Sequence, residues 1–81
     1  MDVTVKYSGL FCSLTGKQKE IVEMEEKGTL GDLLGILCDR YNNLPPLNEG
    51  LIYLVNGRIA KKGQILIEGD EVRIFQMMAG G

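Results

Sequence analysis

One amphipathic helix pattern, with strand patterns on both sides of it, is the feature that most restricts the fold of this 81-residue chain. Between residues 30 and 41, apolar side chains recur at intervals of three and four, which places them on one stripe of a helix. Thr29 is a favourable N-cap for this helix, and Asp32 three positions later completes an approximate capping box. The stripe consists of Leu30, Leu33, Leu34, Leu37, Cys38 and Tyr41. Gly35 is expected to let the helix approach a sheet closely.

The residues before the helix follow the period of two that is typical of half-buried strands. Residues 2–7 and 19–26 both alternate between apolar and polar side chains, and the loop between them predicts an antiparallel hairpin. Residues 9–16 are expected to form a turn region that covers one end of the core. The apolar side chains available for this are Leu10, Phe11 and Leu14.

Several short strands are predicted after the helix. Asn56-Gly57 is a strong hairpin signal, because both central residues of a type I′ turn need positive φ. It joins residues 51–55 to 58–60, and a further apolar run at 65–67 precedes a last strand at 71–76. A right-handed crossover would place the last strand parallel to the first. The pattern therefore predicts an α+β fold of the ubiquitin-like β-grasp type, with a mixed sheet covered on one face by a single helix.

Composition excludes several classes of function. The net charge of −2 and the lack of a basic cluster argue against a nucleic-acid-binding protein, and no apolar run is long enough to span a membrane. Histidine is absent, so the commonest general base is missing and a self-sufficient enzyme is not expected. Cys12 and Cys38 match no metal or redox spacing, and each is expected to be a small buried hydrophobe, Cys38 because of its apolar position on the helix. Since no signal peptide is recognised, we expect a cytoplasmic protein with reduced thiols. No bound cofactor or metal is expected, because two cysteines and scattered carboxylates are a poor ligand set.

The chain ends in Ala79-Gly80-Gly81, which is the strongest candidate for chemistry. We expect residues 1–76 to form the folded domain and residues 77–81 to form a flexible reactive tail. No β-carbon crowds the carboxylate of Gly81, so a thin extended tail of this kind can enter the closed site of another enzyme. That enzyme would use ATP to adenylate the carboxylate, and a sulfur nucleophile could then displace AMP to leave a thiocarboxylate.

Several motifs resemble those of the MoaD/ThiS family of ubiquitin-like sulfur carriers, in the same order along nearly the whole chain. They are Val3-Thr4-Val5-Lys6-Tyr7, Leu14-Thr15-Gly16, Gly28-Thr29-Leu30-Gly31-Asp32-Leu33-Leu34, Val55-Asn56-Gly57, Glu68-Gly69-Asp70-Glu71-Val72 and the terminal Ala79-Gly80-Gly81. The resemblance implies a non-catalytic sulfur donor whose Gly81 is adenylated by an E1-like adenylating and sulfurtransferase enzyme and then thiocarboxylated. It implies a further partner, either a molybdopterin synthase large subunit or a thiazole synthase.

The pathway stays open at this point. The length of the chain resembles the molybdopterin synthase small subunit, whereas Gln76 and Met77 stand where that branch commonly has two prolines, and the tail looks more like the thiamin thiazole carriers. A ubiquitin-like protein modifier, conjugated to lysines through Gly81, is a further alternative. A last alternative is an inert β-grasp interaction module, in which the terminal glycines have no chemical role.

Residues next to the tail are candidates for partner binding. Alternation places Phe75 and Met77 on the face opposite to Val72 and Ile74, where an aromatic ring and a methionine would contact a partner together with Met78. The acidic residues between positions 20 and 26 are interpreted as a solvated strand face. They are Glu20, Glu23, Glu25 and Glu26.

Overall fold

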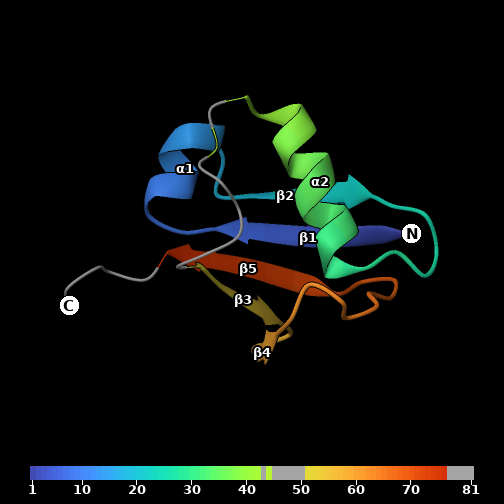
Figure 1. Cartoon of the computed structure of the whole chain (residues 1–81). Helices are drawn as coiled ribbons and strands as arrows, with labels where there is room; N and C mark the ends of the chain where they lie inside the picture. The colour runs from blue at the N-terminus through green and yellow to red at the C-terminus, as the bar shows by residue number, and fades with distance from the viewer. Residues whose placement is uncertain (43, 45–50, 77–81) are drawn as a thin grey trace.

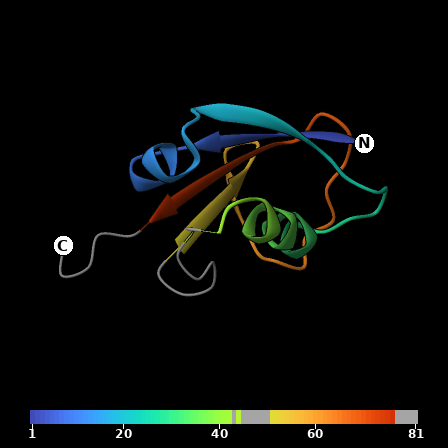
Figure 2. The same ribbon diagram turned by 90° about the horizontal axis from the view of Figure 1, so that it is seen from above.

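The computed structural model describes residues 1–42, 44 and 51–76. Within these residues, seven elements follow one another (Figure 1): β1 (Asp2–Tyr7), α1 (Leu10–Thr15), β2 (Lys19–Glu23), α2 (Leu30–Arg40), β3 (Leu51–Val55), β4 (Arg58–Ala60) and β5 (Glu71–Gln76). The strands form one mixed sheet in the order β2-β1-β5-β3-β4. Figure 2 shows α2 against one face of this sheet and α1 beyond one end of it.

The strand pairing confirms the predicted topology. β1 and β2 pair antiparallel, with Val5 opposite Glu20, and β1 and β5 pair parallel, with Val5 opposite Val72. β3 pairs antiparallel with both β4 and β5. The first and last strands are therefore neighbours in the middle of the sheet, and the α+β, ubiquitin-like β-grasp prediction is confirmed.

The core lies between the sheet and α2. Val3, Val5 and Tyr7 on β1 and Val72 and Ile74 on β5 point into it and are almost completely buried. The helix supplies the facing layer, which consists of Leu30, Leu33, Leu34 and Leu37. Burying such side chains is the main favourable contribution to the free energy of folding.

The start of α2 agrees with the sequence in one respect and differs in another. The Asp32 N–H donates to Thr29 Oγ1, and the Thr29 N–H donates to Asp32 Oδ2, so both halves of the capping box are present. The expected role of Gly35 was wrong, because Gly35 is exposed and a β-carbon there would meet open space. Gly31 makes the close approach instead: its N–H donates to the Lys62 carbonyl, and a β-carbon would lie 3.3 Å from that oxygen.

Two turns are joined by side-chain hydrogen bonds. Asn56 and Gly57 both have positive φ, as the type I′ prediction requires, and Gly69 has a φ of 84° in the second turn. The buried Asp70 accepts hydrogen bonds from Asn56 Nδ2 at 2.8 Å and from the Ile67 N–H at 2.9 Å. The Asn56 side chain in turn accepts from the N–H of Glu71. The turn motif thus holds the start of β5 against the β3–β4 hairpin.

Replacing this buried carboxylate is expected to destabilise the fold. In Asp70→Ala, the Ile67 N–H and the Asn56 amide lose their acceptor, so the free energy of unfolding should fall by about 2 kcal/mol. Urea denaturation measures the loss. Lys61→Ala, in the loop after β4 and with an exposed side chain, is the control and should change the free energy by about 0.5 kcal/mol or less. Equal losses in the two variants would contradict the role of Asp70.

The structure adds a second helix where a turn region was expected, so the single-helix prediction was incomplete. Helix α1 is only six residues long and begins after Gly9 without a side-chain cap. It ends at Gly16 in the left-handed conformation, and the Thr15 hydroxyl donates to the Phe11 carbonyl. Phe11 is 1% exposed and fills the end of the core, as predicted.

Two strand predictions also need correction. β2 ends at Glu23 rather than at residue 26, although Met24 is still buried. Residues 65–67 form only an isolated bridge between Ile65 and Thr29, not a strand. Ile65 and Ile67 are exposed while Leu66 is buried in the core, so this segment contributes to the core without adding a strand to the sheet.

Candidate functional site

Strand β5 leads toward the predicted reactive tail. It is paired on both sides, with β1 and with β3, and runs in the same direction as β1 toward the end of the sheet where α1 lies (Figure 1). Its last residue is Gln76. The remaining predicted site residues lie outside the described residues, and their roles stay predictions. They are Met77, Met78, Ala79, Gly80 and Gly81.

The predicted alternation of side chains along β5 is confirmed. Val72 and Ile74 are buried against the helix side, whereas Arg73 is exposed and Phe75 is half-buried. Phe75 therefore lies on the open face of the sheet, opposite to the core. On this face the ring is accessible to a partner, and the role of Phe75 in partner binding stays a prediction.

Phe75 belongs to a run of apolar side chains across the open face. Ile52 on β3 is the register partner of Phe75, and Leu54, two residues along β3, is the partner of Ile59 on β4. Residues opposite one another on paired strands share a face and lie within contact distance. Ile59 is 78% exposed. We call Phe75, Ile52, Leu54 and Ile59 the apolar strip. A partner could bury this surface without any change in the fold of the domain.

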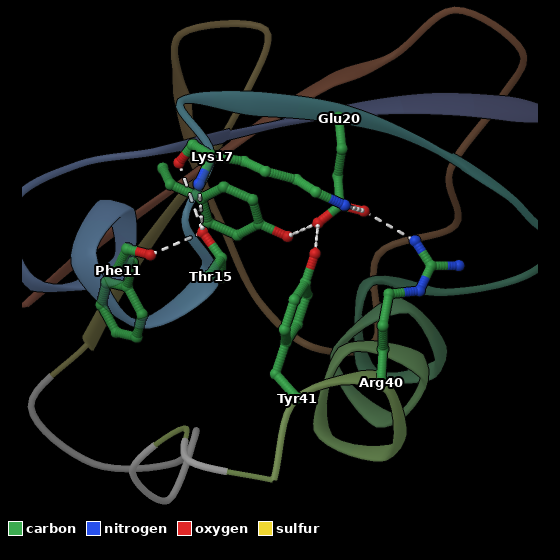
Figure 3. Close-up of polar contacts among 7 residues, drawn as sticks. Phe11, Thr15, Lys17, Glu20, Arg40 and Tyr41 are labelled. Atoms are coloured by element: carbon green, nitrogen blue, oxygen red, sulfur yellow. Dashed lines mark hydrogen bonds and ion pairs between the residues drawn. The ribbon is translucent and has the colours of Figure 1, made fainter.

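The sequence did not predict a cluster around the Glu20 carboxylate (Figure 3). It lies on the helix side of the sheet, near the end of β5. The Glu20 side chain is only 8% exposed. Its Oε2 accepts hydrogen bonds from the hydroxyls of Tyr7 and Tyr41, both at 2.5 Å. Its Oε1 accepts from Arg40 Nη1 at 2.7 Å and lies 3.6 Å from Lys17 Nζ. This cluster joins β1, β2 and the end of α2.

The environment of this cluster shifts the pKa values of its members. Burial by itself would raise the pKa of Glu20, but the hydrogen bonds from Tyr41, Tyr7 and Arg40 outweigh it, and the pKa is lowered. Burial and the neighbouring Glu20 carboxylate raise the pKa of Tyr7 well above its ordinary value. The two tyrosine rings also meet edge to face, with centroids 6.4 Å apart. Glu20 is therefore an ionised hydrogen-bond acceptor, held by two tyrosine hydroxyls and a guanidinium.

This position corrects the interpretation of the acidic stretch as a solvated face. Glu23, Glu25 and Glu26 are exposed, but Glu20 is not. The signal was present in the strand pattern, because Glu20 has the same parity as the buried Val22. Because Tyr7 is the register partner of Ile74, the cluster supports the sheet next to the last residues of β5.

The cysteines show no sign of catalysis or metal binding. Cys38 is exposed, so its expected burial was wrong: it lies at the edge of the helix stripe. Cys12 is half-buried, and its thiol donates to the Tyr7 carbonyl. Among residues 1–42, 44 and 51–76, no group of three or more His, Cys, Asp or Glu could hold a metal ion. Within the same residues, none of the helices has both the length and the apolar character needed to cross a membrane.

Comparison with known proteins agrees with this fold. A putative molybdopterin converting factor subunit 1 from Pyrococcus furiosus is 27% identical, covering 96% of this chain and 99% of that chain, with a TM-score of 0.86. SAMP1 from Haloferax volcanii is 24% identical over 100% of both chains, with a TM-score of 0.89. A chain of the complex of subunits 1 and 2 of the molybdopterin-converting factor from Helicobacter pylori 26695 is 18% identical over 100% of both chains, with a TM-score of 0.70. A search of curated proteins gave no match.

The mixed sheet, its covering helix and the parallel β1–β5 pair define a ubiquitin-like β-grasp domain. The chain belongs to the ThiS family, whose profile matches residues 5–81. It is thus a ubiquitin-like protein of the MoaD/ThiS sulfur-carrier type, and the resemblance seen in the sequence motifs is confirmed.

Proposed function

We propose that this protein is a sulfur carrier whose Gly81 is adenylated and then thiocarboxylated by an E1-like partner. A carboxylate oxygen of Gly81 attacks the α-phosphorus of ATP, and pyrophosphate leaves. Hydrosulfide, or an equivalent sulfur donor at the same oxidation level, then attacks the acyl carbon and AMP leaves with its electron pair. The observation that carries the proposal is the family match, which runs to Gly81 through the central strand β5.

The protein itself supplies positioning rather than catalysis in this proposal. Its sequence contains no histidine. Proteins of this family are small non-catalytic carriers that act with partner enzymes. ATP would be bound by the activating partner, so the carrier needs no cofactor of its own.

For the destination of the sulfur we favour the role of molybdopterin synthase small subunit. The support is the likeness to the putative converting factor subunit 1, at 27% identity over nearly the full length of both chains. Delivery to a thiazole synthase in thiamin biosynthesis is the alternative, and Gln76 and Met77 in place of two prolines favour it. Conjugation of Gly81 to lysines is the other alternative, since SAMP1, a small archaeal modifier protein, has the same fold.

The direct test is the intact mass after incubation with an E1-like adenylating enzyme of the same organism, ATP and a sulfur donor. Exchange of one C-terminal oxygen for sulfur is the expected result. Omitting ATP, and separately using a chain that lacks Gly81, should leave the mass unchanged. Stable conjugates with other proteins would favour the modifier. No change in mass with any adenylating enzyme of the organism would contradict both.

The two pathways are separated by partner binding. The favoured pathway predicts that the chain forms a stable complex with a molybdopterin synthase large subunit in size-exclusion chromatography. It also predicts that the thiocarboxylated form donates sulfur within that complex. Binding and sulfur transfer only with a thiazole synthase would move the assignment to the thiamin branch.

The apolar strip leads to a prediction about activation. In Phe75→Asp, a charge replaces a half-buried ring on the open face, so the chain should remain folded but its conversion to the thiocarboxylate should slow at least tenfold. Intact mass against time measures conversion, and circular dichroism checks the fold. Lys27→Asp, on the loop before α2, is the matched surface control. Unimpaired conversion of Phe75→Asp would refute binding through the strip.

A further inference from the structure

Three cationic side chains stand side by side on the open face of the sheet. Lys6 on β1 is the register partner of Lys19 on β2 and also of Arg73 on β5. We call Lys19, Lys6 and Arg73 the basic row. Like charges directly opposite one another on paired strands destabilise a sheet. The pairing of Lys6 with Lys19 therefore does not stabilise the sheet, and the fold alone does not explain it.

Only part of this positive charge is neutralised within the chain. The Glu71 carboxylate lies 3.1 Å from Lys6 Nζ and 3.5 Å from Arg73 Nε, and these contacts, chiefly the hydrogen bond from Lys6, lower its pKa. Lys19 makes no ion pair among the residues that the structure describes. One carboxylate thus faces three cations, and the row has an excess of two positive charges in a protein whose net charge is −2.

The basic row borders a surface hollow next to the apolar strip. The hollow has a volume of about 560 Å³, and its lining includes all three basic side chains together with Ser8, Gly9 and Cys12. Arg73 is the register partner of Leu54, a member of the apolar strip, and precedes Phe75 by two residues. A partner bound to the strip would therefore extend over the row.

We propose that the basic row binds an acidic segment of the adenylating partner, one that presents Asp or Glu carboxylates beside an apolar contact. Charge complementarity supports this occupant, because carboxylates would neutralise the uncompensated charges that the chain leaves on this face. The apolar strip would supply contact area, and the row would select the partner and speed its association. This inference rests on the proposed function, since it assigns the surface that brings the partner to the tail.

The test uses a charge reversal with a matched control. Lys19→Glu reverses the unpaired member of the row, and Lys62→Glu makes the same change beside the start of α2, where the Lys62 carbonyl accepts from Gly31. In adenylation assays with the E1-like enzyme, followed by release of pyrophosphate, Lys19→Glu should raise the KM for the carrier about tenfold. Lys62→Glu should raise it less than twofold. Added salt should raise the KM of the wild type more than that of Lys19→Glu.

A charge swap tests the chemistry of the partner. Changing one acidic residue of the adenylating enzyme to Lys should restore the KM of Lys19→Glu and impair the wild-type carrier. Equal KM values for Lys19→Glu and Lys62→Glu, or no acidic position that rescues, would overturn the proposal.

Thermal denaturation tests the row without any partner. Because Lys19→Glu would face Lys6 with the opposite charge, its Tm should rise by about 2–5 °C, whereas Lys62→Glu should not show this gain. A Tm that falls in Lys19→Glu would overturn the proposal. If the wild-type chain is not adenylated at all, the proposed function fails, and the Tm comparison still decides whether the row is kept at a cost to stability.

Discussion

One bulky residue added after Gly81 is expected to abolish adenylation and thiocarboxylation, with a loss of rate of 100-fold or more, on the order expected when a reacting group is displaced by about 1 Å or more. The added residue, rather than Gly81, then carries the terminal carboxylate. Its Cβ and side chain also occupy space in the narrow site of the activating enzyme. Intact mass after incubation with the E1-like enzyme, ATP and a sulfur donor measures the effect.

The control replaces the exposed Glu26, in the loop before α2, with the same bulky residue. That variant should react at the wild-type rate, and both variants should melt like the wild type, because neither change touches the core between the sheet and α2. Continued activation of the chain extended after Gly81 would refute the role proposed for the tail, whatever the outcome for the apolar strip.

The largest expected effect on stability is that of Glu20→Ala, which should lose about 3 kcal/mol of the free energy of unfolding. The substitution removes the acceptor of the Tyr7 and Tyr41 hydroxyls and the partner of Arg40 in a buried setting. Glu23→Ala is the matched control, because it lies on the same strand with its side chain exposed, and its loss should be about 0.5 kcal/mol or less. Urea denaturation measures both, and similar losses would contradict the structural role of Glu20.

The charge of Glu20 also predicts a dependence on pH. Its pKa in the folded state is lowered from the ordinary value of 4.5, so its contribution to stability is present above that value and is lost as pH falls through the folded pKa. The stability advantage of the wild type over Glu20→Gln should therefore be full at pH 6 and should shrink as pH falls below about 4.5. Denaturation curves across this range measure it; a constant difference would show that hydrogen-bond geometry, not charge, is responsible.

Local patterns predicted most of the fold. The stripe of Leu30, Leu33, Leu34 and Leu37 is buried as expected, and Thr29 and Asp32 form the predicted capping box. Asn56-Gly57 forms the predicted turn. These features are decided within a few residues, by side-chain period and by allowed backbone angles, so the sequence suffices to predict them.

Predictions failed where distant segments decide the outcome. Helix α1 has no side-chain cap and depends on burying Phe11 in a core made by other elements. Cys38 was expected to be buried and is exposed, whereas Glu20 was expected to be solvated and is buried. Gly31, rather than Gly35, packs closely, because the Lys62 carbonyl reaches it from a loop 31 positions later. Apart from Glu20, whose parity with the buried Val22 indicated the core face, spacing along the chain contains no direct signal for these contacts.

The sequence by itself determined the β-grasp fold, the family motifs and the candidate tail that ends in Gly81, since each depends on local pattern or on a short motif. Only the tertiary structure decided which residues meet. It placed the Glu20 carboxylate within hydrogen-bond distance of the Tyr7 and Tyr41 hydroxyls. It also placed Phe75 opposite Ile52 in the apolar strip. The basic row of Lys19, Lys6 and Arg73 has the same origin. The physical reason is strand register, which places residues from three separate strands opposite one another and is set by the packing of the whole sheet.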